Sequence, residues 1–455
     1  MDKLVLIPFI VASVLLLNNS TRKVFLWVYI PMLTMVPNYF DSKIIQGLPE
    51  LYFWSAALIP VAIAWVFRGF ENYRYHWMDF MIFSYVLVVF YTQWLNSDYK
   101  IAQKTLFNTA LTNLVPYILV RSLIRTKEDI KELVKTITVL GAIVAAFNCY
   151  EARMFVNVFD EYLRRIWPHS VTWDVGFIMS RAGFKRAMGP FSHPIISGFF
   201  FTISLPLAIW SYYEKHFDNP KAGKAVVLLN ALGLLVSISR APIMGGLMGL
   251  LIIYYGWSRH KGTILTISGI AISILLMAAL PSFIEYISVT RATAETADQQ
   301  NAAYRKEMLD GYAEVVAEKP LTGWGRFSVP KVNGMGSIDN QYLGVALHSG
   351  LIAVGIYILF LLWTLNKLYQ MVKDKPFNHS RARLAWCIIG GWVSSIFIQG
   401  TVYLGGQMIQ YLFIIGGISQ TLVAKDWEQE TKAKTLSKTL SSEPRFRFER
   451  GLKKF

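Results

Sequence analysis

Long apolar stretches, separated by short polar clusters, recur along almost the whole chain. A helix needs roughly 20 mostly apolar residues to cross a bilayer, and about 13 windows approach that length. They run approximately over residues 3–18, 23–37, 49–67, 77–95, 105–124, 131–149, 194–212, 224–239, 242–256, 262–281, 341–365, 384–402 and 406–424. The pattern predicts an all-α polytopic membrane protein with about 12–13 transmembrane helices and two long loops.

The composition agrees with a protein that resides in a membrane. Of 455 residues, 54% are hydrophobic and only 16% are charged, whereas about 25% are charged in soluble domains. Cys149 and Cys387 both fall in or beside apolar windows, so we expect packing roles for them. The first window resembles a signal peptide, but Asn18-Asn19-Ser20 is a poor cleavage site, so we expect that this span is retained.

Lysine and arginine predict the orientation, because cytoplasmic loops carry an excess of both. Assigning alternate loops to opposite faces divides the 45 Lys and Arg residues into 28 and 17. The richer face is predicted to be cytoplasmic, with the N-terminus outside. The resulting parts are an N-terminal transmembrane bundle (1–149), a first extracytoplasmic loop (150–193), central transmembrane helices (194–281), a large extracytoplasmic loop (282–340), C-terminal transmembrane helices (341–424) and a basic cytoplasmic tail (425–455).

The outer cations are not spread evenly. Twelve of the 17 lie in the two long loops, 150–193 and 282–340. The excess of Lys and Arg in cytoplasmic loops does not apply to long translocated loops, so the predicted orientation is unchanged. The positive charge of these two loops favours a site for an anionic ligand. The alternative is a solvated rim or contact with lipid headgroups. The tail alternates basic and aromatic residues over 444–448, which favours a position on the anionic inner leaflet over nucleic-acid binding.

The chain lacks the sequence motifs of several common catalytic and binding sites. The sequence has no GxxxxGK[ST] loop, no HExxH, no paired cysteines and no DxD pair. We therefore expect neither a metal nor a cofactor. An ATP-driven pump and a cytoplasmic nucleotide-sugar enzyme are disfavoured, and a substrate delivered within the membrane fits better.

Four segments stand out when the outer loops are taken together. They are Arg186-Ala-Met-Gly-Pro-Phe-Ser-His193-Pro, Ser239-Arg240-Ala-Pro, Tyr304-Arg305 with the helix that follows and ends in Pro-Leu-Thr-Gly-Trp324-Gly-Arg, and Ser-Ile-Asp339-Asn340-Gln-Tyr342-Leu. In this order, over about 185–365, they resemble the O-antigen ligase and O-antigen or exopolysaccharide polymerase family. The remaining spans agree with that family only in general architecture.

The resemblance implies an all-helical membrane fold and transfer of a glycan from a polyprenyl diphosphate to an acceptor glycan or lipid, without metal. It also implies a bacterial inner membrane location, with membrane lipids and a chain-length regulator as further partners. A diphosphate leaving group needs mainly charge stabilisation as its bond breaks. Arginine offers a permanently charged fork that matches phosphate oxygens.

By resemblance, Arg186, Arg240 and Arg305 clamp the diphosphate, with Arg240 and Arg305 acting on the reacting bond and Arg186 binding substrate. Each has an alternative. Arg240 can snorkel to lipid headgroups, Arg305 can be a solvated loop residue, and the neighbours Arg181 and Lys185 make the choice of Arg186 ambiguous.

The remaining candidates also have two interpretations each. His193, before Pro194, is a substrate ligand or a helix cap. Trp324 stacks on a sugar ring or anchors a loop at the membrane interface. Asn340 and Tyr342 are expected to bind substrate through the shared motif.

The clearest departure from the family is Asp339. In the ligases a histidine proposed to activate the acceptor hydroxyl precedes the Asn-x-Tyr-Leu segment, and here that residue is an aspartate. Asp339 acts as the base or only orients a sugar or an arginine. His348 cannot replace the histidine, because nine residues at 100° each place it on the opposite helix face. We expect His348 to be a packing residue.

These observations favour a polysaccharide polymerase over a ligase that attaches the glycan to a lipid or other acceptor. The third alternative is a transporter of the same lipid-linked glycan. Transporters tend to carry ionisable residues near the membrane midplane, whereas the charges here lie mainly in the outer loops.

Overall fold

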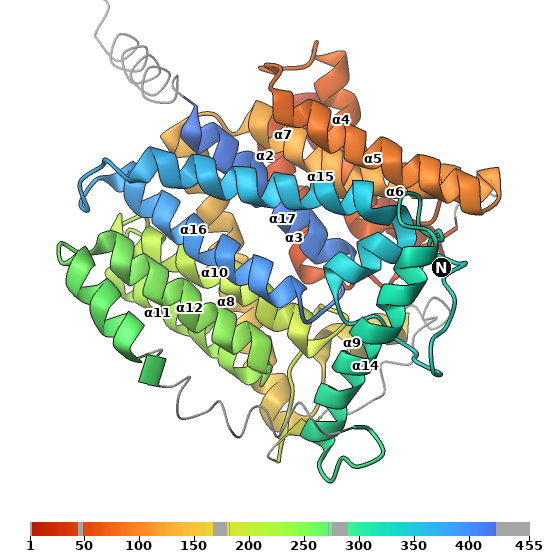
Figure 1. Cartoon of the computed structure of the whole chain (residues 1–455). Helices are drawn as coiled ribbons and strands as arrows, with labels where there is room; N and C mark the ends of the chain where they lie inside the picture. The colour runs from red at the N-terminus through yellow and green to blue at the C-terminus, as the bar shows by residue number, and fades with distance from the viewer. Residues whose placement is uncertain are drawn as a thin grey trace, which may run out of the picture.

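A computed structural model describes residues 2–43, 49–166, 180–181, 183–271, 273–274 and 290–424. Within these residues the protein is almost entirely helical, and its long helices lie side by side in a bundle (Figure 1). The elements of the first third are η1 (Asp2–Leu6), α1 (Ile7–Asn18), α2 (Thr21–Val24), η2 (Phe25–Tyr29), α3 (Ile30–Met35), β1 (Asp41–Ser42), β2 (Leu51–Tyr52), α4 (Phe53–Phe67), α5 (Trp77–Asn96), α6 (Tyr99–Thr109), η3 (Ala110–Leu114), α7 (Val115–Leu123) and α8 (Lys127–Met154).

The remaining elements follow the first long loop. They are α9 (Val158–Ile166), β3 (Ser180–Arg181), β4 (Phe184–Lys185), α10 (Pro194–Tyr213), α11 (Pro220–Val236), α12 (Arg240–Trp257), α14 (Ala297–Glu318), α15 (Gln341–Val372), α16 (Ser380–Gln399) and α17 (Gly406–Val423). A further helical run covers 261–271. Strands β1 and β2 pair antiparallel, as do β3 and β4. The rest of the predicted span 262–281 and the tail 425–455 lie largely outside the described residues.

Five of the described helices are long and apolar enough to cross a membrane: α5, α8, α10, α15 and α16. Two shorter apolar helical runs cover Lys3–Asn18 and Phe53–Phe67. Leucine, isoleucine and phenylalanine side chains are exposed along several of these helices, as expected where lipid replaces water. The protein is a multi-pass membrane protein, as the apolar windows predicted.

Two predicted spans contain a π-helical turn directly before a proline. The turn η3 precedes Pro116 and joins α6 to α7, while η2 precedes Pro31 and joins α2 to α3. Proline lacks an N–H and its ring crowds the preceding turn. A widened π turn is one way in which a helix absorbs that disturbance.

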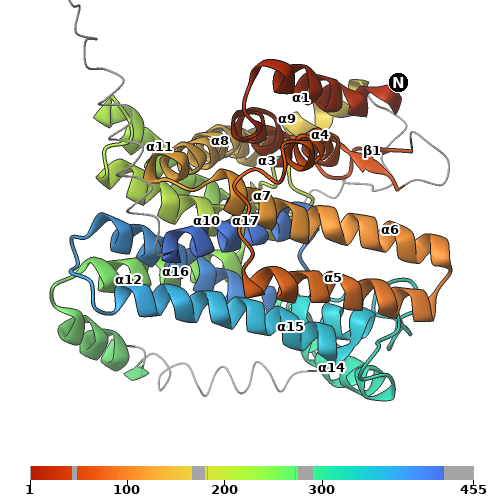
Figure 2. The ribbon, with the colours of Figure 1, turned by 90° about the horizontal axis from the view of Figure 1, so that it is seen from above.

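Helix α10 lies in the centre of the bundle, where it packs against α8, α11, α12 and α16 (Figures 1 and 2). Small residues allow the closest approaches. A Cβ atom on Gly198 of α10 would lie 2.6 Å from Pro242 of α12, and one on Gly249 would lie 3.0 Å from the Gly390 carbonyl oxygen of α16. Gly245 and Gly249 therefore serve helix packing, as their GxxxG spacing predicted.

Helix α15 is interrupted at Gly350, where the windows predicted one continuous helix. Gly350 has φ of 77°, outside the helical region. The loop after α14 fills the break: the N–H groups of Trp324 and Gly325 donate to the carbonyls of Leu347 and His348 at 2.7 and 3.0 Å, and the Leu351 N–H donates to Pro320 at 2.7 Å. A Cβ atom on Gly350 would clash with the Leu321 carbonyl. The loop after α14 and helix α15 therefore complete each other's backbone hydrogen bonds.

Candidate functional site

The first turns of α10 and α12 pack together near Gly198 and Pro242, and the carboxylate of Asp339, just before α15, acts electrostatically on His193 at the start of α10. The first residue of α12 is Arg240, and His193 and Asn340 are the N-cap residues of α10 and α15. Three of the four sequence segments therefore begin a helix. The fourth, α14, packs against α15 (Figure 1).

A direct hydrogen bond joins the first two segments. Arg186 donates from Nη2 to the Ser239 hydroxyl at 2.9 Å, and Ser239 in turn donates to the Ser237 carbonyl at 2.9 Å. The turn that contains these serines is tight, since Ile238 has φ of 43°, which is uncommon for a β-branched residue. Arg186 is thus fixed beside the residue that precedes Arg240.

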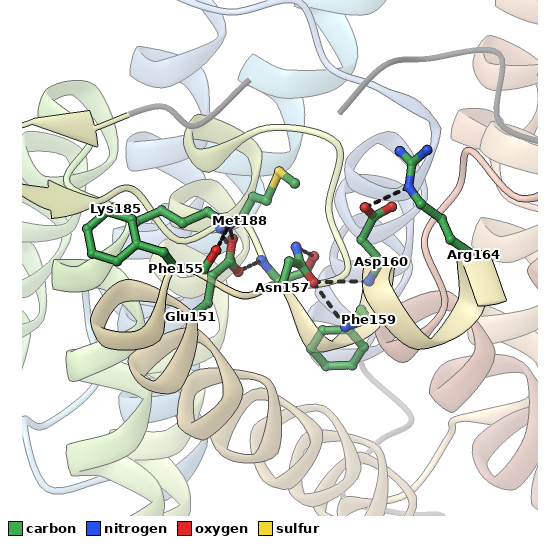
Figure 3. A network of polar contacts seen from close by, with 9 residues as sticks. Glu151, Phe155, Asn157, Phe159, Asp160, Arg164, Lys185 and Met188 are labelled. Atoms are coloured by element: carbon green, nitrogen blue, oxygen red, sulfur yellow. Dashed lines mark hydrogen bonds and ion pairs between the residues drawn. The ribbon is translucent and has the colours of Figure 1, made fainter. Parts of the chain in front are cut away.

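Buried contacts around Glu151 hold the loop that carries Arg186 (Figure 3). The Glu151 carboxylate accepts from the N–H groups of Met188 and Gly189 at 3.3 and 2.8 Å and pairs with the Lys185 ammonium at 3.3 Å. Asn157 donates to the Gly189 carbonyl at 2.8 Å. The backbone on both sides of Arg186 is therefore attached to the end of α8 and the start of α9.

These contacts distinguish Arg186 from its neighbour Lys185. The Lys185 ammonium is compensated by Glu151 and also donates to the Phe155 carbonyl at 3.1 Å. The Arg186 Nε atom is buried and has no hydrogen-bond partner among the residues that the structure describes. Burial, and next the nearby charge of Arg181, lower the pKa of Arg186 to about 10. The guanidinium is still charged at pH 7, and a desolvated cation with an unused donor is suited to an anionic ligand.

His193 is a helix cap and a neutral side chain. Its Nδ1 accepts a hydrogen bond from the Ile195 N–H at 3.1 Å. Burial, and next the charge of Arg186, lower the pKa of His193 to about 4, while the Asp339 carboxylate opposes the shift. Because Nδ1 is an acceptor, the proton of the neutral ring is on Nε2. His193 can therefore donate a hydrogen bond but is poorly placed to act as a base through Nε2.

Asp339 lies where α14 meets the start of α15. Its N–H contacts the sulfur of Met308 at 3.3 Å, and its carboxylate accepts from the Ser337 hydroxyl at 3.0 Å. Arg305 is one turn before Met308 on α14, about 60° from it around the helix axis. Among the described residues Arg305 has no hydrogen bond or ion pair, so its charge remains available.

Asn340 and Tyr342 attach α15 to α16. The Asn340 side chain accepts from the Leu343 N–H at 3.0 Å and donates to the Gly400 carbonyl at 3.1 Å. The Tyr342 hydroxyl donates to the Ile396 carbonyl at 2.9 Å. In this conformation each side chain is held in place by a hydrogen bond to the end of α16.

Trp324 contacts α14 and α15. Its indole N–H donates to the Val315 carbonyl at 2.9 Å, and the Lys319 ammonium lies 4.2 Å from the ring centroid. Among the described residues it has no hydrogen bond or ring contact with the other candidates. His348 packs edge-on against the Tyr403 ring, with centroids 5.7 Å apart, which agrees with the predicted packing role.

Carboxylates accompany the cations of the two long loops, 150–193 and 282–340, so the description of both loops as basic was incomplete. The large loop holds eight Asp and Glu residues beside its six Lys and Arg, and Arg291 there pairs with Glu307 at 2.6 Å. In the first loop Arg164 pairs with Asp160 and Arg165 with Glu161. Part of the positive charge of both loops is therefore compensated within the loops themselves.

Sequence reasoning missed Glu151 and Ser239 as site residues. Glu151 falls in the last turn of a largely apolar helix, and an ionisable residue in that position is a signal in its own right. Ser239 was visible as part of a motif, but its contact with Arg186 crosses 53 residues of chain. The described residues contain no group of three His, Cys, Asp or Glu side chains that could hold a metal ion.

The fold and this site define a helical membrane protein with arginines placed at one end of its bundle. Residues 225–358 match the family described as O-Antigen ligase. Over this region, which is less than a third of its length, the chain contains an O-antigen ligase domain, and the protein is an enzyme of the O-antigen ligase type. The match includes Arg240, Arg305, Trp324 and Asp339, and Arg186 and His193 precede it.

The family assignment establishes the general reaction, which is glycan transfer of the O-antigen ligase or polymerase type from lipid-linked glycan substrates. Among curated proteins, no sequence matches the chain. The acceptor, and with it the choice between polymerase and ligase, does not follow from the family alone.

Proposed function

We propose that the protein is a polysaccharide polymerase, which transfers a polyprenyl-diphosphate-linked glycan to an acceptor glycan at the outer face of a bacterial inner membrane without a metal ion. The observation that carries the proposal is Arg186. Its guanidinium is half-buried, has an unused Nε donor and is held against the turn of Ser239 and Arg240. This arrangement suits the oxygens of a diphosphate.

In the proposed reaction an acceptor hydroxyl oxygen attacks the anomeric carbon of the donor glycan. The bond from that carbon to the diphosphate oxygen breaks, and the polyprenyl diphosphate leaves with the electron pair. Arg186, Arg240 and Arg305 stabilise the growing negative charge on the leaving group, and the Nε2–H of His193 donates to the same anion or to the glycan. Asp339 accepts the proton of the hydroxyl.

Asp339 is also the reason to prefer a polymerase. It stands where the ligases resembled by this chain have a histidine, so the acceptor side of the site differs from theirs. A ligase that attaches the glycan to a lipid is the second candidate, supported by the family description of residues 225–358. In the proposed orientation the C-terminus is cytoplasmic, and a chain-length regulator is a further partner.

Analysis of glycans in cells that depend on this chain tests the proposal. Cells carrying Arg186→Ala are expected to accumulate single lipid-linked repeats, because elongation stops. Accumulation of full-length polymer without its final acceptor would instead identify a ligase. The corresponding assay with purified protein and a lipid-diphosphate donor should give products longer than one repeat, and normal chain elongation by Arg186→Ala would contradict the diphosphate clamp.

A further inference from the structure

Arg326 is an exposed cation that the proposed transfer reaction does not use. It directly follows Gly325, whose N–H donates to the His348 carbonyl at 3.0 Å, so the loop is fixed against α15. The Arg326 N–H donates to the side chain of Gln93, in the last turn of α5, at 2.9 Å. Among the described residues the guanidinium itself forms no hydrogen bond or ion pair. The backbone at Arg326 is therefore held by two helices while its charged group stays available.

Tyr403 brings an aromatic ring to the same part of α15. The ring packs edge-on against His348, with centroids 5.7 Å apart, and the Tyr403 hydroxyl lies 3.5 Å from the His348 Nδ1 atom. A Cβ atom on Gly344 would lie 2.5 Å from the Tyr403 ring, so the ring lies directly on the backbone of α15. Burial raises the pKa of Tyr403, and the charge of Arg326 opposes that shift. Tyr403 and the Arg326 guanidinium are therefore neighbours.

The turn that carries Tyr403 is joined to the proposed transfer site. The Gly400 carbonyl accepts a hydrogen bond from the Asn340 side chain at 3.1 Å, and Asn340 directly follows Asp339, the proposed base. Gly344, which lies under the Tyr403 ring, is one helical turn beyond Asn340, or about 6 Å along the axis. A glycan with its reacting hydroxyl at Asp339 can therefore reach Tyr403 with an adjoining sugar residue.

A second pair of aromatic rings lies near Arg326. Tyr52 of β2 stacks on Trp54, with ring centroids 5.5 Å apart and an interplanar angle of 9°. The Trp54 Nε1 atom is buried and has no hydrogen-bond partner in the part of the chain that the structure describes. Burial, and next the charge of Asp41, raise the pKa of Tyr52 to about 12. Glu50 acts in the same direction, whereas the charge of Arg326 opposes the shift.

The charges around Tyr52 and Arg326 balance. Asp41 is the partner of Tyr52 in the pair of β1 and β2, and Glu50 pairs with Lys43 at 3.5 Å. Two carboxylates and two cations thus accompany the aromatic rings, which offers little net attraction to a phosphate group. Hydrogen-bond donors and acceptors beside aromatic faces, without net charge, suit a neutral ligand rich in hydroxyl groups. A sugar residue has this chemistry.

We propose that Arg326, Tyr52 and Tyr403 bind a sugar residue of the acceptor glycan, next to the residue whose hydroxyl reacts. The Arg326 guanidinium donates to hydroxyl oxygens of this sugar, and the tyrosine rings contact its apolar face. The inference rests on the proposed polymerase function, because it assigns the acceptor side of the same site. The diphosphate of the donor is bound by other residues, so donor binding does not depend on Arg326.

Steady-state kinetics with the purified full-length chain test the proposal. The donor is the lipid-diphosphate-linked repeat, and the acceptor probe is the oligosaccharide that mild acid releases from the same lipid-linked glycans. Arg326→Ala is expected to raise the KM for the acceptor by roughly tenfold to a hundredfold, as for the loss of a charged hydrogen-bond donor. The kcat and the KM for the donor should stay nearly unchanged. Tyr52→Leu should raise the acceptor KM by about fivefold.

Lys331→Ala is the matched control, because Lys331 is an exposed cation of the same loop and makes no described ion pair. Its acceptor KM should equal that of the unchanged protein. If Arg326→Ala does not fold, Arg326→Lys provides the test, with a smaller rise in the same KM because an ammonium cannot reproduce the guanidinium fork. An unchanged acceptor KM in the Arg326 and Tyr52 variants, or an equal rise in Lys331→Ala, would overturn the proposal.

Direct binding separates this inference from the proposed function. Saturation-transfer NMR with the same oligosaccharide measures its Kd without turnover. Binding that weakens in Arg326→Ala, in a protein that forms no elongated product, would support the sugar site and contradict the polymerase. Elongation by the unchanged protein, with an unaltered Kd and acceptor KM in Arg326→Ala, would support the polymerase and overturn the sugar site. The absence of oligosaccharide binding to the unchanged protein would also overturn it.

Discussion

Arg186 donates a hydrogen bond of 2.9 Å to Ser239, the residue directly before Arg240. This contact joins two arginine-bearing segments that are separated by helices α10 and α11. It also explains how a loop arginine that belongs to no helix has a defined position.

Replacing Arg186 should reduce transfer strongly. Removing one positioned donor from a developing negative charge lowers kcat by about a hundredfold or more, so we expect that loss for Arg186→Ala. Arg186→Lys should recover only part of it, because an ammonium cannot reproduce the guanidinium fork. Initial rates with a purified lipid-diphosphate donor measure both.

Arg153→Ala is the control for that experiment, because Arg153 is an exposed cation in the last turn of α8 and makes no described ion pair. Its rate should match that of the unchanged protein. A similar loss in Arg153→Ala and Arg186→Ala would point to the overall charge of the loop as the cause and contradict a specific clamp.

The Glu151 network should be important for stability. Lys185 and Glu151 are both buried, with side-chain exposures of 11% and 1%. Glu151→Gln leaves the lysine charge without compensation, which costs about 3–5 kcal/mol for a buried pair. We expect a clear fall in Tm and a loss of transfer, and Lys185→Met in the same chain should restore part of the Tm.

Glu161→Gln supplies the comparison, since it breaks an exposed pair with Arg165 in the same loop. Exposed pairs contribute little, so its Tm should not change measurably. If Glu151→Gln were as stable as Glu161→Gln, the network would not hold the loop.

The titration of His193 should show in stability at acid pH. Its folded pKa of about 4 lies below the ordinary value of 6.5, so the unfolded chain binds more protons between these values. The contribution of His193 to stability is present above pH 6.5 and is lost as the pH falls toward 4. His193→Asn keeps a capping acceptor and a donor, so we expect near-normal transfer at pH 7 and a weaker fall of Tm on acidification.

A pH–rate profile of the unchanged protein checks the same assignment. An inflection near pH 6.5 that His193→Asn removes would show that the ring titrates as an ordinary histidine, against its assignment as a neutral donor. His193→Leu should lose both the cap and the donor, and therefore both stability and rate.

Gly350→Ala should disturb the junction between the outer loop and α15. The residue has φ of 77°, and a Cβ atom would clash with the Leu321 carbonyl. A left-handed conformation alone costs a residue with a Cβ roughly 1–2 kcal/mol, and the clash adds to it. We expect a lower Tm, faster proteolysis within 319–328 and reduced transfer.

Gly355→Ala tests the same helix without that constraint, because a Cβ atom there meets nothing within 4 Å. It should be neutral or slightly stabilising. If Gly350→Ala and Gly355→Ala had the same Tm and the same transfer rate, the interruption of α15 at Gly350 would not be required for stability or transfer.

Much of the fold was predictable because lipid requires continuous apolar helices. The windows 77–95 and 194–212 differ from α5 and α10 by one residue at one end. The break at Gly350 could not be predicted, because apolar residues continue on both sides of it. It depends on hydrogen bonds from Trp324 and Gly325, which only the folded loop brings to that position.

The site was predictable to a smaller extent. The order of the four motifs along the chain identified Arg186, Arg240 and Arg305 as candidate site residues. A helix start at Asn340 was also predicted, and Asn340 is the N-cap residue of α15. Arg186 is distinguished from Lys185 as the candidate ligand of an anion because Lys185 pairs with Glu151. The distance between Glu151 and Lys185 along the sequence gives no sign of that pair. The roles of Arg305 and Asp339 in transfer stay predictions.

The interrupted helix α15 has a consequence for how the protein is made. The carbonyls of Leu347 and His348 receive their hydrogen bonds from Trp324 and Gly325, which leave the ribosome earlier. Backbone groups without partners are costly in hydrocarbon. The segment that carries Trp324 and Gly325 must therefore lie against this part of α15 for both carbonyls to have partners, so a span of the bundle is completed by residues that precede it in the chain.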